Sequence, residues 1–138
     1  VNPQTQKHLR YVHKLKSYLS EIKTIEKGES VSYMRKFIAT KQTKIGVIPI
    51  GYADGLNRHL SHQGFTVYIN GKHAPIVGNI CMDMCMVDIG NDFDCNVGDK
   101  AFIFESSDDI NELAEAMGTI NYEILCSLKH RVKLEYVT

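Results

Sequence analysis

The stretch Ile45-Gly-Val-Ile-Pro-Ile-Gly-Tyr-Ala-Asp-Gly-Leu-Asn-Arg58 decides the fold of this chain. Its first half, Ile45 to Ile50, is a run rich in β-branched apolar residues, which predicts a buried strand. The strand is expected to stop at Gly51-Tyr-Ala-Asp-Gly55, because Asp-Gly is a dipeptide typical of turns. The turn then carries a tyrosine, an aspartate and, a little further on, the cation of Arg58. Loops after strand ends often hold functional residues, although spacing alone favours a plain hydrophobic strand with an ordinary turn and a core tyrosine.

The composition fits one globular domain. The chain has 138 residues, of which 43% are hydrophobic and 23% charged, and at this size about two-thirds of the unfolded surface can be buried. Sixteen basic residues balance sixteen acidic ones, so no bulk charge directs the chain to nucleic acid or to an anionic membrane. No apolar run approaches the ~18–20 residues that span a bilayer, and no signal peptide opens the sequence. We therefore expect neither nucleic acid nor membrane as a partner.

The cysteines and histidines do not indicate a metal site. The cysteines are Cys81, Cys85, Cys95 and Cys126. None of them form the Cys-x-x-Cys spacing typical of zinc ligands, and His59 and His62 stand in a polar loop without carboxylate or cysteine partners nearby. Two disulfides in a secreted chain are one alternative. Cys81 and Cys85, however, lie in an apolar run with methionines, as buried thiols commonly do, so we expect free thiols and a cytoplasmic location.

Short strands and turns predominate outward from the central stretch. Leu15 to Ile25 is ambiguous, because its apolar residues follow helical spacing while its composition and the bounding Gly28 favour a strand. Asn70-Gly71 is a strong hairpin signal, and Pro75 in the next strand indicates an edge or a bulge. Further strands are expected over residues 31–33 with a continuation at 37–40, and over 65–69, 72–77, 80–89, 100–105 and 131–137.

One helix is clearly expected near the end of the chain. Asp109 is the predicted cap, Glu112 completes a capping box, and Gly118 ends the helix. Residues 121–128 are a candidate for a second short helix. The expected fold class is therefore a mainly β, antiparallel, barrel-like domain with one or two short helices.

Several polar side chains stand out from this pattern. Asp83 interrupts the apolar run Ile80–Val87, where a carboxylate is costly unless it is paired or hydrogen-bonded. It marks a strand end, is an exposed residue of an alternating strand, or orients a segment that lines a site. Tyr33, Tyr52 and Tyr122 stand beside turns rather than inside apolar runs. They either bury a ring and expose a hydroxyl or serve in proton transfer, which requires a cation or polar network to lower a pKa of about 10.

Five segments in order resemble the C-terminal β domain of bacterial alanine racemase, an enzyme that uses pyridoxal phosphate. The resemblance extends from about Leu15 to Val137 and favours a strand over residues 15–25. The segments are Gly28-Glu-Ser-Val-Ser-Tyr33, Ile48-Pro-Ile-Gly-Tyr-Ala-Asp-Gly55, Pro75-Ile-Val-Gly-Asn-Ile-Cys-Met-Asp83, Asn121-Tyr-Glu-Ile-Leu-Cys126 and Arg131-Val.

The resemblance implies a larger enzyme than this chain. In that family an N-terminal α/β barrel holds the cofactor on a lysine, and the C-terminal domain of the partner subunit closes the active site. The resemblance thus implies a homodimer that interconverts L- and D-alanine and supplies D-alanine for peptidoglycan. The chain begins without methionine, so we expect residues 1–14 to connect an upstream barrel to a β domain over residues 15–138. The isolated chain is then expected to be inactive.

The resemblance also implies roles for individual residues. By position in the motifs, Tyr33 matches the catalytic tyrosine that faces the substrate opposite the lysine. Met82 matches the residue whose backbone amide meets the substrate carboxylate, with Cys81 and Asp83 beside it. Tyr122 matches the tyrosine that reaches the cofactor phosphate. Tyr52, Arg58 and Ile120 match residues that line the access corridor.

The chain departs from the family pattern at four positions. Met34 replaces a glycine, Asn79 stands where an arginine is frequent, Met84 replaces a glutamine, and Lys133 replaces a proline. None of these departures removes a proton-transfer group, but they leave open a serine or broad-specificity racemase. A non-catalytic dimerisation or binding module of the same fold is a second alternative. A related cofactor-dependent decarboxylase is a third, although its cysteine-aspartate and glycine-arginine-tyrosine motifs are not seen.

Overall fold

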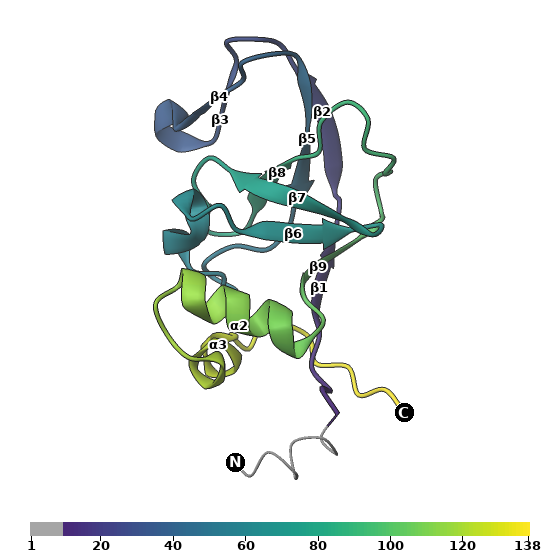
Figure 1. Cartoon of the computed structure of the whole chain (residues 1–138), viewed down its shortest axis with the longest axis vertical. Coiled ribbons are helices and arrows are strands. Elements are labelled where there is room, and N and C mark those ends of the chain that lie inside the picture. Colours follow the sequence, from purple (N-terminus) through teal and green to yellow (C-terminus); the bar gives the residue numbers. More distant parts are fainter. Residues whose placement is uncertain (1–9) are drawn as a thin grey trace.

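Seven strands form one antiparallel sheet in the computed structural model, which describes residues 10–138 (Figure 1). The strands are β1 (Leu15–Tyr18), β2 (Glu21–Ile25), β5 (Thr43–Ile48), β6 (Thr66–Ile69), β7 (Lys72–Val77), β8 (Cys85–Asp88) and β9 (Lys100–Phe104). Their order in the sheet is β1-β9-β6-β7-β8-β5-β2, and each neighbouring pair is antiparallel.

The sheet curls because its two edge strands are neighbours in the chain. β1 and β2 lie at opposite ends of the strand order but are separated only by Leu19 and Ser20. The Leu19 amide donates to the Asp99 carbonyl at 2.9 Å, and the Ser20 amide donates to the Val47 carbonyl at 2.9 Å. Two adjacent residues thus bond to both ends of the sheet, which bends it toward closure. The predicted antiparallel, barrel-like domain is confirmed.

The ambiguous segment 15–25 is β structure divided in two. β1 pairs with β9 and β2 pairs with β5. Leu15 and Leu19, four residues apart, are both buried. A spacing of four places two side chains on the same face in a strand as well as in a helix, so this spacing does not distinguish the two. Gly46, opposite in β5, leaves the room that Leu19 needs, since a Cβ at Gly46 would lie 2.6 Å from Leu19 Cδ2.

Several predicted strand bounds were wrong. The central strand ends at Ile48 rather than Ile50, since Pro49 lacks the amide that would extend the ladder. Residues 80–84 form a loop closed by the Cys81 amide and the Met84 carbonyl at 2.9 Å, so β8 begins only at Cys85. Residues 131–137, predicted as a closing strand, are irregular and pair with none of the strands that the structure describes.

The Asn70-Gly71 hairpin is confirmed, with Ile69 opposite Lys72 and positive φ at both turn residues. Pro75 lies opposite Thr66 of β6, at a point where pairing with β8 has not yet begun. The Ile76 amide bonds toward β6, donating to the Phe65 carbonyl at 3.0 Å, so the nitrogen of Pro75 faces the unpaired side. The proline is therefore tolerated at a local edge, as predicted.

A small hairpin and short helices complete the fold. A two-stranded sheet pairs β3 (Ser30–Val31) with β4 (Phe37–Ile38). The helical elements are η1 (Tyr33–Arg35), η2 (Arg58–His62), α2 (Ser107–Ala116) and α3 (Asn121–Ser127). Tyr33, predicted at the end of a strand, lies in η1 instead, because Ser32 turns the chain with φ 68°.

Both predicted helices near the end of the chain are present. The cap of α2 is Ser106 rather than Asp109: the Ser106 hydroxyl accepts from the Asp109 amide at 3.2 Å, and Asp109 completes the capping box in place of Glu112. The box moved because Asp109 Oδ2 reaches back to the Ser106 amide at 3.0 Å. Met117 is the C-cap of α2, and Gly118 follows it in the left-handed conformation with φ 68°.

The main core fills the inside of the curled sheet. Its fully buried side chains include Leu19, Ile48, Val67, Ile69, Val87 and Phe104. Ile110 and Leu113 of α2 and Ile124 of α3 join the same cluster, so the helices close one end of the barrel (Figure 1). Each fully buried side chain of this size contributes about 1.5–3 kcal/mol relative to exposure.

Candidate functional site

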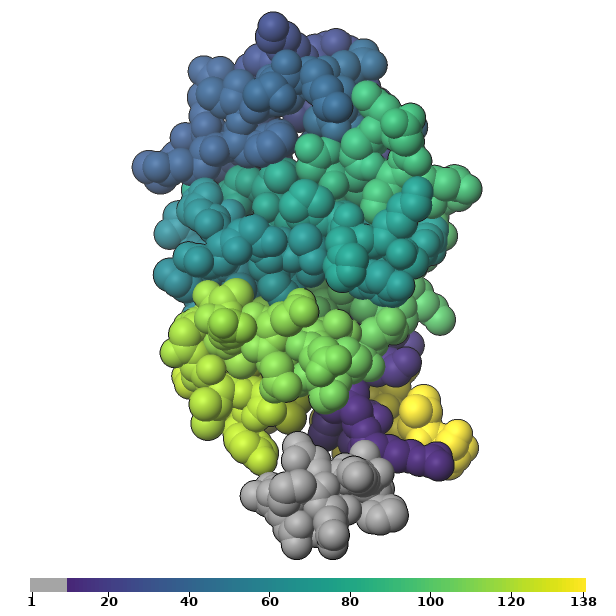
Figure 2. Space-filling view, viewed as in Figure 1, coloured from purple at the N-terminus to yellow at the C-terminus, as the bar shows by residue number. Residues whose placement is uncertain are grey.

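The predicted site residues lie on loops and short helices rather than in the sheet. η1, η2 and α3 lie along one side of the molecule, at the left in Figure 1. In the space-filling view of the same face, the segment around η1 protrudes at the upper left, above the surface formed by η2 (Figure 2). Among the exposed large apolar side chains are Tyr33, Met34, Tyr52, Met82, Met84, Ile120 and Tyr122.

The loop at residues 51–55 is docked on the backbone of the Cys81–Met82 loop. The Tyr52 amide donates to the Cys81 carbonyl at 3.1 Å, and the Ala53 amide donates to the Met82 carbonyl at 3.0 Å. Gly51 makes this approach possible, because a Cβ there would lie 2.2 Å from the Cys81 oxygen. The two loops that carry Tyr52 and Met82 therefore form one unit.

The docking also sets the direction of the Met82 amide. The Cys81 carbonyl and the Met82 amide belong to the same peptide unit, and no cis peptide occurs in the described residues. A trans peptide points its C=O and N–H in opposite directions. Because the carbonyl faces Tyr52, the Met82 N–H is aimed away from the 51–55 loop. The Met82 N–H therefore points to a side from which an acceptor outside this pair of loops can approach it.

An arginine bridges these two loops from outside. Arg131 Nε lies 2.9 Å from Asp54 Oδ1, and Arg131 Nη2 lies 2.7 Å from Asp83 Oδ1. Asp54 is buried, and its second oxygen accepts from the Gly51 amide at 2.8 Å. The hydrogen bond that Arg131 donates to Asp83, and then the negative charge of Asp54, raise the pKa of Arg131 above its usual value. Asp83 is therefore neither a strand residue nor unpaired, because it holds a cation at the edge of the Met82 loop.

Tyr33 projects from a tightly held turn. Its side chain is 72% exposed, while the loop around it is bonded to the 78–81 segment. The Ser32 hydroxyl donates to the Asn79 carbonyl at 2.7 Å and lies 3.8 Å from Cys81 Sγ. Cys81 thus contacts the tyrosine loop on one side and the Tyr52 loop on the other. The phenol is presented outward on a backbone with several anchors.

Arg58 lies beside the tyrosine loop in a cationic hollow of about 590 Å³. The hollow is lined by Met34, Lys36, Arg58, His59, His62, Gln63 and Asn79, with no acidic residue among them. Such a surface attracts anions and carboxylates. Arg58 is held there as the first residue of η2, which Asn57 caps by accepting from the His59 amide at 2.8 Å.

Ile120 and Tyr122 stand at the start of α3, with side chains 63% and 70% exposed. The other end of this helix is fixed to the 51–55 loop. The Lys129 amide donates to the Asp54 carbonyl at 3.0 Å, and Gly55, with φ 115°, lies so close to Ser127 that a Cβ would come within 2.6 Å of its carbonyl oxygen. The structure thus ties α3 to the Tyr52 loop, while the Tyr122 side chain remains largely exposed to solvent.

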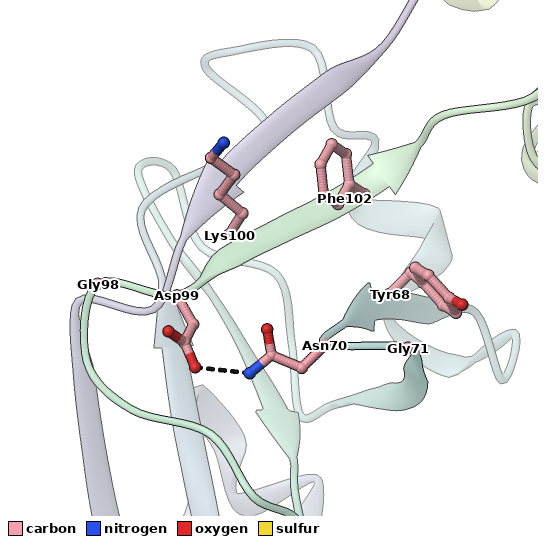
Figure 3. A pocket seen from close by; sticks show the side chains of 7 residues that line it. All are labelled: Tyr68, Asn70, Gly71, Gly98, Asp99, Lys100 and Phe102. Atoms are coloured by element: carbon pink, nitrogen blue, oxygen red, sulfur yellow. Dashed lines mark hydrogen bonds between the residues drawn. The ribbon is translucent and has the colours of Figure 1, made fainter.

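A second hollow, of about 430 Å³, lies on the outer surface of β6 and β9 and is lined by none of the predicted site residues (Figure 3). Within it Asn70 Nδ2 donates to Asp99 Oδ2 at 2.6 Å. The Asn96 amide and then Asn70 hold the pKa of Asp99 below its usual value. These bonds brace the hairpin turn against the loop before β9, so Asn70 and Asp99 are already used in the fold.

Three residues of the loop network were not predicted as site residues. They are Asp54, Asn79 and Arg131. A carboxylate between Gly51 and Gly55 was a visible signal for Asp54, because a buried aspartate in a tight turn needs partners. Arg131 stands in one of the family segments, but no signal in the sequence indicated its partners, which stand 48 and 77 positions earlier in the chain. No group of three or more potential metal ligands occurs in residues 10–138, and no helix in that range has the length and apolarity to cross a membrane.

The fold and its loops define a curled antiparallel β domain that carries exposed aromatic and cationic side chains along one side. The family model described as "Alanine racemase, C-terminal domain" matches residues 12–136. The chain therefore belongs to the alanine racemase C-terminal domain family.

Individual relatives agree with this assignment. The chain is 42% identical over 134 residues to alanine racemase 1 of Clostridium acetobutylicum, a match that covers 94% of this chain and 34% of the relative. A structure of Clostridium difficile 630 alanine racemase in complex with cycloserine matches with TM-score 0.80 and 42% identity, over 86% of this chain and 32% of that one. A Bartonella henselae alanine racemase with covalently bound pyridoxal phosphate matches with TM-score 0.84 and 35% identity, over 90% and 34%. The chain spans about a third of the length of these relatives.

Proposed function

We propose that this chain is the C-terminal domain of a pyridoxal-phosphate-dependent alanine racemase and lends Tyr33 to the active site of a partner subunit. The observation that carries the proposal is the combination of a 72% exposed phenol with an anchored backbone. A side chain that is held in place yet faces outward is suited to act on something that this chain does not itself contain. The family assignment supplies the chemical context.

The proposal includes a barrel domain upstream. The matched relatives are about three times as long as the matched segment, and an α/β barrel of ~250 residues is a typical size for the remainder. We propose that residues 1–14 form the connection and residues 15–138 the β domain. Residues 1–9 lie outside the described residues. The chain alone then lacks the lysine that binds the cofactor, so it does not catalyse racemisation by itself.

The described residues fit a contributing role toward the cofactor, rather than a complete binding site. The Tyr122 phenol stands exposed at the start of α3 and is free to donate its O–H to a phosphate oxygen. When bound, pyridoxal phosphate withdraws electrons from the substrate Cα and makes its proton removable. We propose that the barrel lysine holds the cofactor, with Tyr122 as a supporting contact.

Inversion of a stereocentre requires a proton to leave one face and another to arrive on the opposite face. We propose that Tyr33 exchanges the proton on one face and the barrel lysine on the other. The Met82 amide, aimed away from the Tyr52 loop, is oriented to receive the substrate carboxylate. Cys81 and Asp83 keep this loop in place through their contacts with Tyr52 and Arg131.

Access to such a site is narrow in this proposal. Tyr52, Arg58 and Ile120 line the corridor, and the cationic hollow at Arg58 favours an amino acid carboxylate. The exposed apolar side chains on the same side are covered by the partner barrel in a homodimer. We propose a cytoplasmic setting, in agreement with four free cysteines. Alanine is the proposed substrate. Serine is the alternative, since Met34, Asn79 and Met84 depart from the family pattern near the corridor.

The test uses the full-length enzyme loaded with pyridoxal phosphate. Tyr33→Phe is expected to lower racemisation by ~10²–10⁴, the range for loss of a general acid–base group. Tyr136→Phe is the control, because Tyr136 is 94% exposed near the chain end, and it should leave the rate unchanged. Tyr122→Ala should weaken cofactor binding and admit larger substrates. Near-normal racemisation by Tyr33→Phe would contradict the proposed role, and rates with alanine and serine decide the substrate.

A further inference from the structure

The loop that carries Tyr33 has an unusual backbone. Ser32, Met34 and Arg35 have φ values of 68°, 62° and 50°, in the region that favours glycine, yet no glycine stands between Ser32 and Lys36. Ser32 combines its φ with ψ 177°, a region that is populated almost entirely by glycine. Such a conformation persists only where surrounding contacts impose it. The contacts that impose it are therefore part of how Tyr33 is presented.

Asn79 makes these contacts from a buried position. Asn79 is 5% exposed. Its side-chain Nδ2 donates to the Tyr33 carbonyl at 3.0 Å, and its backbone carbonyl accepts from the Ser32 hydroxyl at 2.7 Å. Gly78, just before it, has φ 70° and leaves no space for a Cβ, which would lie 2.7 Å from Ser32 Cβ. The loop is thus seated on Gly78 and bonded on both sides of the tyrosine by one residue.

His62 fixes the orientation of the Asn79 amide. The Tyr33 carbonyl can only accept, so the amide nitrogen of Asn79 must face it and the amide oxygen must face the other way. That oxygen lies 3.0 Å from His62 Nε2, which must therefore carry a proton. η2 is itself tied to the same segment, because the Ile80 amide donates to the Ser61 hydroxyl at 2.8 Å. A chain of contacts runs from η2 through Asn79 to the tyrosine.

We infer that Asn79 is a positioning residue for Tyr33: through its amide, held by His62, it fixes the tyrosine backbone in a conformation that the loop sequence does not favour. This inference rests on the proposed function for its catalytic consequence, but not for the contact itself. A misplacement of about 1 Å can cost ~10²-fold in rate.

The decisive variant is Asn79→Asp in the full-length enzyme with pyridoxal phosphate. Aspartate has nearly the same shape, and one of its oxygens can still accept from His62, but the other then faces the Tyr33 carbonyl without a proton to donate. The matched control is Asn91→Asp. Asn91 Nδ2 donates to the Gln42 carbonyl at 2.9 Å, a bond of the same kind between exposed loops that contain none of the proposed site residues.

Two readouts separate positioning from loss of folded enzyme. The first is the α-deuterium isotope effect on kcat, measured from each alanine enantiomer, which does not depend on the amount of active enzyme. Tyr33→Phe identifies the enantiomer whose proton the tyrosine removes. Asn79→Asp should raise the isotope effect for that same enantiomer and lower kcat by ~10–10²-fold with little change in KM. The second is hydrogen exchange of residues 32–36, which should become faster in Asn79→Asp and stay unchanged in Asn91→Asp.

Each outcome decides one claim. Faster exchange without an effect on racemisation, together with full activity of Tyr33→Phe, overturns the proposed function but leaves the contact intact. Loss of activity in Tyr33→Phe with normal rates, isotope effects and exchange in Asn79→Asp overturns the inference. If Asn79→Asp does not fold, His62→Leu removes the donor that orients the amide without changing Asn79. It should show the same two effects in weaker form, and their absence would equally refute the inference.

Discussion

Replacing Gly51 by alanine tests how tightly the Tyr52 and Met82 loops are docked. A Cβ at this position would lie 2.2 Å from the Cys81 oxygen and 2.4 Å from the Met82 oxygen. An ordinary contact needs about 3.4 Å, so the loops must separate by ~1 Å. The two amide–carbonyl bonds that join them, now 3.0 and 3.1 Å, then exceed hydrogen-bond length. At about 1–2 kcal/mol for each lost bond, we expect a total destabilisation of about 2–4 kcal/mol.

The assay is denaturant unfolding of the chain followed by circular dichroism, because the sequence contains no tryptophan. The control is Gly64→Ala, where φ is 68° but no atom lies within 4 Å of the added Cβ. That variant reports backbone strain alone and should lose only about 1 kcal/mol. If Gly51→Ala destabilises the chain no more than Gly64→Ala, the two loops are not a rigid unit and the derived direction of the Met82 amide fails.

Three further predictions, with four substitutions, test other parts of the structure. Burial raises the pKa of the Cys85 thiol to about 12, with a smaller effect from Cys81, whereas the unfolded thiol ionises near 9. The stabilisation is therefore complete below pH 9 and is lost between pH 9 and about 12, where the unfolding free energy falls by about 1.4 kcal/mol per pH unit. Cys85→Ala should reduce this slope. Ser106→Ala should lower the unfolding free energy by about 1 kcal/mol by removing the cap of α2, whereas Glu112→Ala should be nearly neutral. A large loss with Glu112→Ala and none with Ser106→Ala would instead support the capping box predicted from the sequence. Met34→Gly should stabilise the chain by about 0.5–1 kcal/mol, because Met34 has φ 62° and an exposed side chain; a loss of stability in thermal unfolding would show that its side chain packs.

The local signals in the sequence predicted the strands well and their ends less well. The turn at Asn70-Gly71 and the strand of β5 follow from residues that are neighbours in the chain. The ends of β5 and β8 were missed for different reasons. Pro49 is a local signal for the end of β5, because it lacks a backbone amide. The loop at residues 80–84 is instead imposed by distant partners, namely the 51–55 loop and Arg131.

The site divides in the same way. The tyrosines and the Met82 segment were identifiable as motifs, but their mutual arrangement was not. The bridge from Arg131 to Asp54 and Asp83 joins three separate parts of the chain, and nothing local to Asn79 in the sequence indicates its partner Tyr33. Its contact with Tyr33 depends on a positive φ at Ser32, which no residue in the loop would suggest. Long-range contacts of this kind require the folded geometry.

The measurement that tests the central claim most directly is complementation between two inactive forms of the full-length enzyme. One carries Tyr33→Phe, and the other carries a substitution of the barrel lysine that binds the cofactor. If Tyr33 acts in the partner's active site, a mixed dimer has one site with both defects and one with neither, and random mixing should restore about a quarter of wild-type racemisation. Each form alone should remain inactive. Absence of any recovered activity in verified mixed dimers would contradict the account, because Tyr33 would then serve only its own subunit or no active site at all.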